Sequence, residues 1–222
     1  MYISIIIPVF NRSKLILRTL QSISGQSYVD FECLVIDDFS TDGIVQEFRK
    51  WGLDERFKLI KNKRSKGAQG ARNTGITISK GEYICLFDSD NIMESNFLKE
   101  HVNNLQFEKS NIISICHSQF YNCDLTRAEQ DASVMPSNWV KPNGRILENL
   151  LLENTYADFN EIVFPKSIFE YLPLLDESIV AFQELDFVLQ SADIMEYKLI
   201  EKFLVRYVIN QNDSISNSGK SF

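Results

Sequence analysis

Two carboxylates at the end of an apolar run are the residues of this sequence best placed to do chemistry. Tyr83 to Phe87 is an apolar run of strand length, and Asp88 and Asp90 follow it, one residue apart. In an open parallel sheet, ligands bind beyond the carboxyl ends of the strands, so this strand would hold acids where a ligand can reach them. Oxygen ligands without Cys or His beside them suit a hard cation, Mg²⁺ or Mn²⁺, which would bring an anionic ligand such as a diphosphate. A turn or a helix N-cap uses the same residue types and is the alternative interpretation.

A second apolar strand ends in the same way. Phe31 to Ile36 is followed directly by Asp37 and Asp38. Parallel strands of one sheet end at a common edge. Acids from the two strand ends are therefore expected to converge, whatever ligand the site holds.

Glu184 is a carboxylate in an apolar setting. The pattern from Ile179 to Ser191 predicts a helix, and apolar residues such as Val180 and Phe187 lie one turn from Glu184 on either side. Desolvation disfavours the charged form of a carboxylate and raises its proton affinity, which suits a general base near neutral pH. The alternative is a structural glutamate at the rim of a core helix, paired with a basic side chain.

The elements that position these acids alternate between strand and helix, as in a doubly wound, mostly parallel α/β sheet. Strands are expected at residues 3–9, 31–36, 57–60, 83–87, 111–120, 161–164 and 203–209. Helices are expected around 16–23, 44–48, 69–79, 97–105, 146–152, 166–171 and 179–191. Asn11 or Ser13 is predicted to cap the first helix, and the strand at 111–120 to be more exposed than the others. The polar segment 121–144 is either an acceptor-facing loop or a plain surface connection.

Composition narrows the class of protein and its compartment. A length of 222 residues with 44% hydrophobic and 24% charged residues suits one globular domain. A net charge of -7 argues against a nucleic acid partner and against a polybasic membrane anchor. The start has no basic region before its apolar run, and no run reaches membrane-spanning length. The four cysteines are interpreted as buried free thiols in a reducing cytoplasm.

Several stretches together resemble family 2 of the GT-A nucleotide-sugar glycosyltransferases, across most of the chain. The matching stretches are Ser-Ile-Ile-Ile-Pro-Val-Phe-Asn-Arg (4–12), Val-Ile-Asp-Asp-Phe-Ser-Thr-Asp (35–42), Lys-Gly-Ala-Gln-Gly-Ala-Arg-Asn-Thr-Gly (66–75), Lys-Gly-Glu-Tyr-Ile-Cys-Leu-Phe-Asp-Ser-Asp (80–90), Leu-Leu-Asp-Glu-Ser (174–178) and Gln-Glu-Leu-Asp-Phe-Val-Leu (183–189). The resemblance implies a GT-A fold and an inverting transfer of a sugar from a nucleoside diphosphate sugar, most often a UDP-sugar, to an acceptor hydroxyl.

The resemblance also implies where the nucleoside would lie. By matching position, Pro8, Phe10 and Asn11 would border it, with Phe10 where the family usually has an aromatic residue that stacks on the base. Asp38 would accept a hydrogen bond from the uracil imide, and Asp37 would support that loop.

The remaining roles follow from the same resemblance. Arg72 would approach the diphosphate, with an ordinary helix-surface arginine as the alternative. Asp88, Ser89 and Asp90 would form the DxD motif of the donor site, with Asp90, helped by Asp88, as the ligand of Mn²⁺ or Mg²⁺. Glu184 matches the catalytic base, which is usually an aspartate in this family.

The resemblance divides the chain into a nucleotide-sugar-binding half, residues 1–92, and an acceptor-binding half, residues 93–222. It suggests a carbohydrate or lipid-linked glycan acceptor in bacterial surface polysaccharide synthesis, at or near the inner face of the cell membrane. Three departures touch this assignment: Phe39 replaces a usual glycine, Gln190 a common arginine, and the region of Asn210 lacks a histidine that many relatives have.

Two other functions are compatible with such a sheet. A sugar-1-phosphate nucleotidyltransferase would need a glycine-rich phosphate loop after the first strand, where this chain has Phe10 and Asn11. A non-catalytic scaffold with a decayed site is supported only by the departures at Glu184 and Asn210. Dinucleotide binding is disfavoured because no G-x-G-x-x-G follows a strand.

Overall fold

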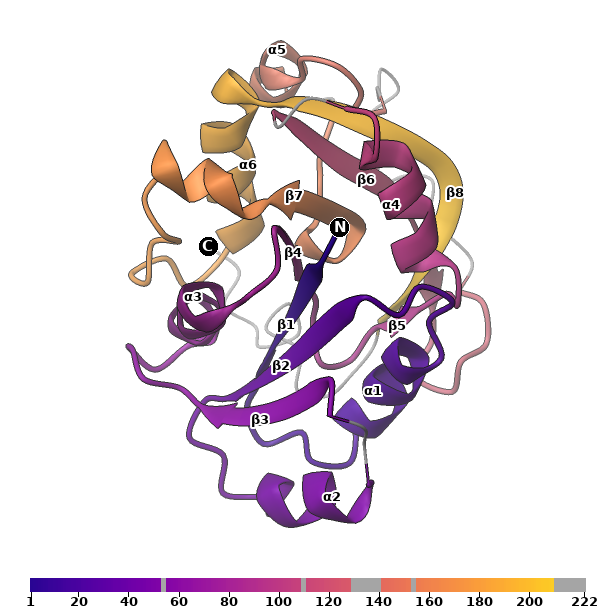
Figure 1. Cartoon of the computed structure of the whole chain (residues 1–222), viewed down its shortest axis with the longest axis vertical. Helices are drawn as coiled ribbons and strands as arrows, with labels where there is room; N and C mark the ends of the chain where they lie inside the picture. The colour runs from indigo at the N-terminus through magenta and orange to yellow at the C-terminus, as the bar shows by residue number, and fades with distance from the viewer. Residues whose placement is uncertain (53–54, 109–110, 129–140, 153–154, 210–222) are drawn as a thin grey trace.

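The computed structural model describes residues 1–52, 55–108, 111–128, 141–152 and 155–209. These residues form one mixed sheet with helices on both of its faces (Figure 1). In spatial order its strands are β3 (Phe57–Lys61), β2 (Phe31–Asp37), β1 (Ile3–Val9), β4 (Tyr83–Leu86), β7 (Ile162–Pro165), β6 (Ile112–Tyr121), β8 (Glu196–Val208) and β5 (Ile92–Met93).

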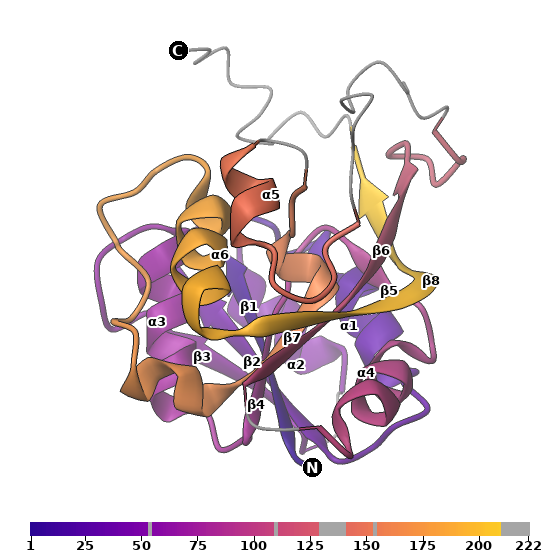
Figure 2. The same ribbon diagram turned by 90° about the horizontal axis from the view of Figure 1, so that it is seen from above.

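The helices divide into two layers that pack on opposite faces of the sheet (Figures 1 and 2). One layer holds α1 (Ile16–Ser24), α2 (Ile44–Lys50) and α4 (Phe97–Leu105), and the other holds α3 (Ala68–Ile78), α5 (Leu147–Leu151) and α6 (Gln183–Ile194). Two short 3₁₀ helices, η2 (Phe159–Glu161) and η3 (Lys166–Glu170), flank β7. None of the helices in the described part of the chain combines the length and apolar character that a bilayer span requires.

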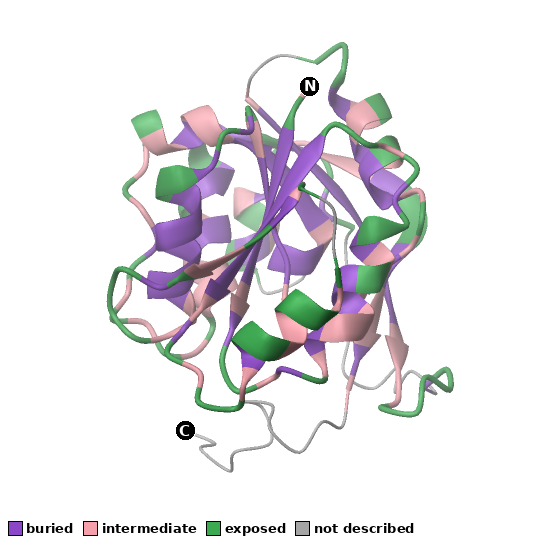
Figure 3. Ribbon diagram, turned by 60° about the horizontal axis from the view of Figure 1, so that its bottom comes forward, coloured by how far each residue is buried: buried purple, intermediate pink, exposed green. Residues whose placement is uncertain are grey.

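The central strand β1 shows why the sequence folds this way. Ile5 and Ile7 belong to one apolar cluster and Ile6 to the other, and all three are fully buried. The strands at the centre of the sheet are drawn mostly as buried in Figure 3. A strand covered on both faces needs a continuous apolar run, which β1 has. Helix α3 packs so closely on β1 at Gly75 that a Cβ added to this glycine would lie only 2.3 Å from the side chain of Ile6. Glycine is therefore required at this contact.

Strand direction decides which residues reach the functional edge. Strands β1, β2, β3 and β4 are parallel, β7 runs antiparallel to both β4 and β6, and β8 is parallel to β6. Six strands therefore run one way, and only β7 and β5 oppose them within the described sheet. The carboxyl ends of β1, β2, β4, β6 and β8 share one edge with the amino end of β7. This arrangement confirms the predicted α/β class with a mostly parallel sheet.

Three local predictions are wrong. Strand β6 is largely buried, because it lies between β7 and β8 instead of at an edge. The buried hydroxyl of Ser114 finds a hydrogen-bond partner in the core, His101 Nδ1, at 2.8 Å. Cys123 is exposed, while the other three cysteines are buried as expected. No side chain caps α1; Asn11 instead accepts a hydrogen bond from the backbone of Thr41.

The helix at the acceptor end also differs from its prediction. Helix α6 begins at Gln183 and not at Ile179, because Phe182 adopts a left-handed backbone with φ 53° just before it. Val180 lies outside the helix and is 71% exposed. Half of the polar segment expected at 121–144, residues 129–140, lies outside the described residues, as does the tail from residue 210.

Candidate active site

The turn after β4 carries the first part of the site, with Asp88 held from two sides. Arg72 Nη2, from α3, donates to Asp88 Oδ1 at 2.8 Å. Asn160 Nδ2, at the amino end of β7, donates to Asp88 Oδ2 at 2.9 Å, and its own amide oxygen accepts from the Asp88 backbone at 2.8 Å. Asn160 is fully buried, so the carboxylate of Asp88 is fixed by groups that cannot easily move.

Asp90 lies on the α1 side of the same turn. Arg12 Nη1 lies 2.5 Å from Asp90 Oδ2, and Arg18 donates to the Asp90 backbone oxygen at 2.9 Å. Ser89, between the two acids, is buried and lies 3.5 Å from Arg12. The two carboxylates of the DxD turn therefore each contact a guanidinium, one from each flank.

The carboxyl ends of β1 and β2 form the second part of the site. Asp38 is buried and accepts from Asn62 Nδ2 at 2.7 Å and from the Gly67 backbone at 2.8 Å, so it is joined to the loop that leads into α3. Phe10 is 44% exposed, with the ammonium of Lys66 4.5 Å from its ring centre. Pro8 lies within β1, where it pairs with Ile36 of β2.

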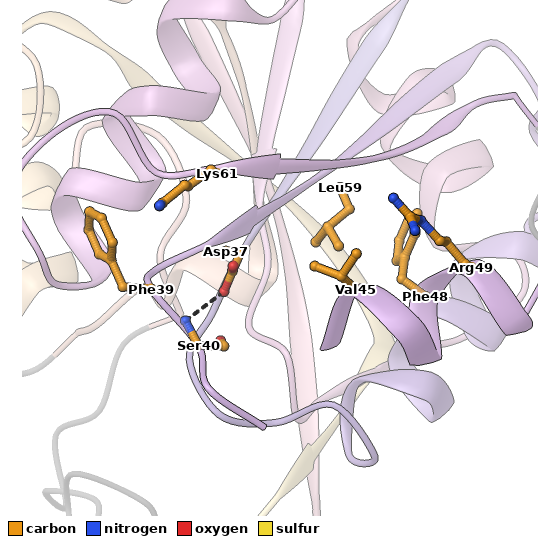
Figure 4. A pocket seen from close by; sticks show the side chains of 8 residues that line it. All are labelled: Asp37, Phe39, Ser40, Val45, Phe48, Arg49, Leu59 and Lys61. Carbon is orange, nitrogen blue, oxygen red and sulfur yellow. Dashed lines mark hydrogen bonds between the residues drawn. The ribbon is translucent and has the colours of Figure 1, made fainter. Parts of the chain in front are cut away.

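Asp37 and Phe39 face a hollow beside this region (Figure 4). Asp37 Oδ1 accepts from the Ser40 backbone at 2.9 Å and so shapes the turn. Phe39 adopts a left-handed backbone with φ 63°, the conformation that the glycine usual in the family would adopt without strain. The hollow has a volume of about 640 Å³ and is lined by Asp37, Phe39, Ser40, Val45, Phe48, Arg49, Leu59 and Lys61.

Glu184 enters the site from the first turn of α6. The hydroxyl of Tyr156 donates to Glu184 Oε1 in a short hydrogen bond. The preceding residue, Gln183, accepts from Arg72 Nη1 at 2.8 Å, so one arginine joins Asp88 to the start of α6. The apolar stripe expected around Glu184 is absent on its amino side, because α6 starts only at Gln183.

Arg72 is a buried connector at the centre of the site. Its guanidinium lies 4.9 Å from the ring centre of Phe159 and 3.0 Å from Gln69 Oε1, in addition to its contacts with Asp88 and Gln183. The alternative of an ordinary helix-surface arginine is therefore wrong, since Arg72 is only 6% exposed.

Two observations bring the separate acids to one region. The guanidinium of Arg72 bonds both Asp88 and Gln183, the residue before Glu184. Burial raises the pKa of the Tyr207 hydroxyl, near the end of β8, and the carboxylates of Asp158, Asp88, Asp90 and Glu184 raise it further. The DxD turn and the start of α6, which are distant in the sequence, therefore lie near each other.

Asp158 adds a further carboxyl group to this site. Burial raises the pKa of its carboxyl, and the charges of Asp88 and Glu161 raise it further, so this group favours its protonated form. The acids offer only hard oxygen donors, which fit Mg²⁺ or Mn²⁺. No group of three or more His, Cys, Asp or Glu side chains poised for a metal occurs among the described residues, so a diphosphate and water would have to supply further ligands.

Four side chains of this site were missed by reasoning from sequence: Tyr156, Asp158, Asn160 and Tyr207. Three of them precede β7, whose antiparallel direction brings its amino end to the functional edge. One signal was present in the sequence. Asp158 and Glu161 form a capping box around η2, the Asp-x-x-Glu spacing that marks the start of a helical turn.

Solved structures with the same architecture define the class. TarS of Staphylococcus aureus in complex with UDP-GlcNAc superposes with a TM-score of 0.77 at 19% identity, covering 98% of this chain and 61% of that one. The mannosyltransferase PcManGT of Pyrobaculum calidifontis, in complex with GDP-Man and Mn²⁺, gives a TM-score of 0.71 at 18% identity, covering 95% and 58%. The fold is therefore that of the GT-A glycosyltransferases.

Sequence comparison gives the family. The sequence profile of Glycosyl transferase family 2 matches residues 4–172, and the chain belongs to that family. It is 38% identical over 117 residues to the UDP-Glc:alpha-D-GlcNAc-diphosphoundecaprenol beta-1,3-glucosyltransferase WfgD of Escherichia coli, covering 49% of this chain and 45% of the relative. It is 30% identical over 123 residues to the glycosyltransferase GlyG of Streptococcus pneumoniae, covering 55% and 40%. The chain thus spans less than half the length of these curated relatives.

Proposed function

We propose that this chain transfers a sugar, with inversion, from a UDP-sugar to an acceptor hydroxyl in the synthesis of a bacterial surface glycan. The observation that carries the proposal is geometric: the guanidinium of Arg72 bonds both Asp88 of the DxD turn and Gln183, the residue next to Glu184. A base on one side of an anomeric carbon and a charge-stabilising group on the other are what such a transfer requires.

The residues divide the work. The carboxylate of Glu184 accepts the proton of the acceptor hydroxyl as its oxygen bonds to the anomeric carbon. The bond from that carbon to the diphosphate breaks, and the electron pair leaves with UDP. Asp90 and Asp88 would hold Mn²⁺ or Mg²⁺, which when bound neutralises the charge that develops on the diphosphate. Asp38, beside the exposed ring of Phe10, would bind the uracil ring of the donor.

The two halves of the chain follow the same division. Residues 1–92 would bind the donor through the ends of β1, β2 and β4, and residues 93–222 would contribute the base and bind the acceptor. The name of the Escherichia coli relative WfgD includes a diphosphoundecaprenol-linked sugar. An acceptor of that kind would bring this chain to the inner face of the cell membrane.

Replacing the proposed base tests the function. Glu184→Gln should lower kcat by ~10² to 10⁴, the usual worth of general base catalysis, and leave the Kd for UDP nearly unchanged. Asp186→Asn is the matched control, because Asp186 lies on the same helix but bonds Gln190 at 2.9 Å on the exposed side. Rates come from UDP release with a panel of UDP-sugars and lipid-linked acceptors. Equal losses in the two variants, or full activity of Glu184→Gln, would contradict the assignment.

A further inference from the structure

The DxD turn is fastened to the α1 side of the molecule by cations. Arg12 contacts the side chain of Asp90, and Arg18 contacts its backbone oxygen. Thr19 donates to the backbone oxygen of Asn91 at 2.7 Å, one residue further on. The two arginines thus approach the same residue, Arg12 at its carboxylate and Arg18 at its backbone oxygen.

The Arg12–Asp90 pair is withdrawn from water. The exposed fractions of the two side chains are 17% and 14%, and the contact joins Arg12 Nη1 directly to Asp90 Oδ2 at 2.5 Å. A carboxylate this poorly hydrated requires a compensating charge, because an uncompensated buried charge is strongly unfavourable. In the described structure, Arg12 contributes that charge.

The two arginines of the turn are held differently. Arg72 belongs to helix α3, and Gln69 and Gln183 both bond its guanidinium. Arg12 lies in the loop between β1 and α1, directly after Asn11, which has a left-handed backbone with φ 50°. A loop carries a side chain that can move more readily than one packed within a helix.

We propose that Arg12 is an internal counter-cation of Asp90, which competes with the divalent cation for this carboxylate and moves to the diphosphate when the cation binds. The proposal rests on the proposed function, because it needs a cation and a nucleoside diphosphate at this site. A guanidinium and a divalent cation on the same carboxylate repel each other, so each weakens the binding of the other. The released guanidinium suits phosphate oxygens, with which it forms paired hydrogen bonds.

Mn²⁺ binding tests this competition directly. The Kd for Mn²⁺ is measured without nucleotide, from the electron paramagnetic resonance signal of the free ion, for the wild type, Arg12→Gln and Arg18→Gln. Arg18→Gln removes the same charge beside Asp90 and leaves the carboxylate contact intact. Arg12→Gln is expected to bind Mn²⁺ about tenfold more tightly than Arg18→Gln, because its carboxylate lacks the competing cation.

Two further readouts extend the test. Mn²⁺ should raise the melting temperature of Arg12→Gln more than that of the wild type, since at equal ligand concentration a tighter ligand of the native state stabilises it more. At saturating Mn²⁺, UDP should bind Arg12→Gln more weakly than the wild type, because the guanidinium that moves to the diphosphate is gone.

The outcomes separate the inference from the proposed function. If Asp90→Asn abolishes Mn²⁺ binding but Arg12→Gln binds no more tightly than Arg18→Gln, Arg12 only orients Asp90 and the competition is refuted, while the proposed function stands. If Mn²⁺ binding is insensitive to Asp90→Asn, the cation site of the proposed function fails and the inference fails with it.

Discussion

The hydrogen bond from Tyr156 to Glu184 predicts a positioning role that can be measured. Burial raises the pKa of the Tyr156 hydroxyl, and the charges of Asp158 and Glu184 raise it further, so this group remains a donor at any working pH. A glutamate side chain has several rotamers, and this bond selects one of them. Tyr156→Phe removes the bond and keeps the ring.

The magnitude follows from the kind of bond that is lost. A hydrogen bond to a charged group is worth about 1.5–3 kcal/mol, and about 1.4 kcal/mol corresponds to a factor of ten in rate. Tyr156→Phe should therefore lower kcat by roughly 10- to 150-fold, if the bond is needed to aim the carboxylate. The KM for the donor should change little, because Tyr156 contacts the start of α6 and not the donor end of the site.

Steady-state UDP release gives kcat and KM for the variant, and thermal unfolding shows whether it remains folded. Tyr171→Phe is the matched control, because it removes a hydroxyl from a residue that is 77% exposed. A kcat within twofold of the wild type would refute the positioning role. A loss confined to KM or to the melting temperature would refute it equally.

Two further predictions concern the amino end of β7. Asn160→Ala should lower the free energy of unfolding by about 1–3 kcal/mol, because it removes both side-chain hydrogen bonds to Asp88 at a fully buried position. It should also weaken the binding of Mn²⁺ with UDP. Thermal unfolding and calorimetric titration measure the two effects, and an unchanged affinity would contradict the prediction. Burial raises the pKa of Glu161 from 4.5 to about 7, so the folded state holds a proton that the unfolded state has lost, and this contribution to stability is lost as pH rises from about 4.5 through about 7. The free energy of unfolding, measured with urea between pH 4.5 and 8, should fall with pH by up to about 3 kcal/mol less in Glu161→Gln than in the wild type. An equal fall in both proteins would contradict the raised pKa of Glu161.

The donor half of the fold could be predicted from the sequence because its signals are local. The strands around Ile3 to Val9 and Phe31 to Ile36 are continuous apolar runs, and helices with a regular apolar spacing follow each of them. A parallel sheet then brings Asp38 and Asp88 to one edge without further information.

The acceptor half could not be predicted as well, for identifiable reasons. Strand β7 runs against its neighbours, and no local pattern gives the direction in which a short strand pairs. Asn160 therefore could not be placed beside Asp88. The left-handed backbone at Phe182 shortens α6, and a large apolar residue gives no warning of that conformation. Tyr207 was missed because its local sequence does not show that acids from three separate segments, Asp158, the DxD turn and Glu184, act on its hydroxyl.

The position of β7 also has a consequence for how the protein is made. Strand β4 lies inside the finished sheet, with β1 on one side and β7 on the other. Domains begin to fold while the chain emerges from the ribosome, amino-terminal end first. Until residues 162–165 emerge, the nascent sheet presents β4 as an open edge, the kind of edge that recruits other chains. The same event that closes this edge brings Asn160 to Asp88, so the donor site is completed only after most of the chain has been synthesised.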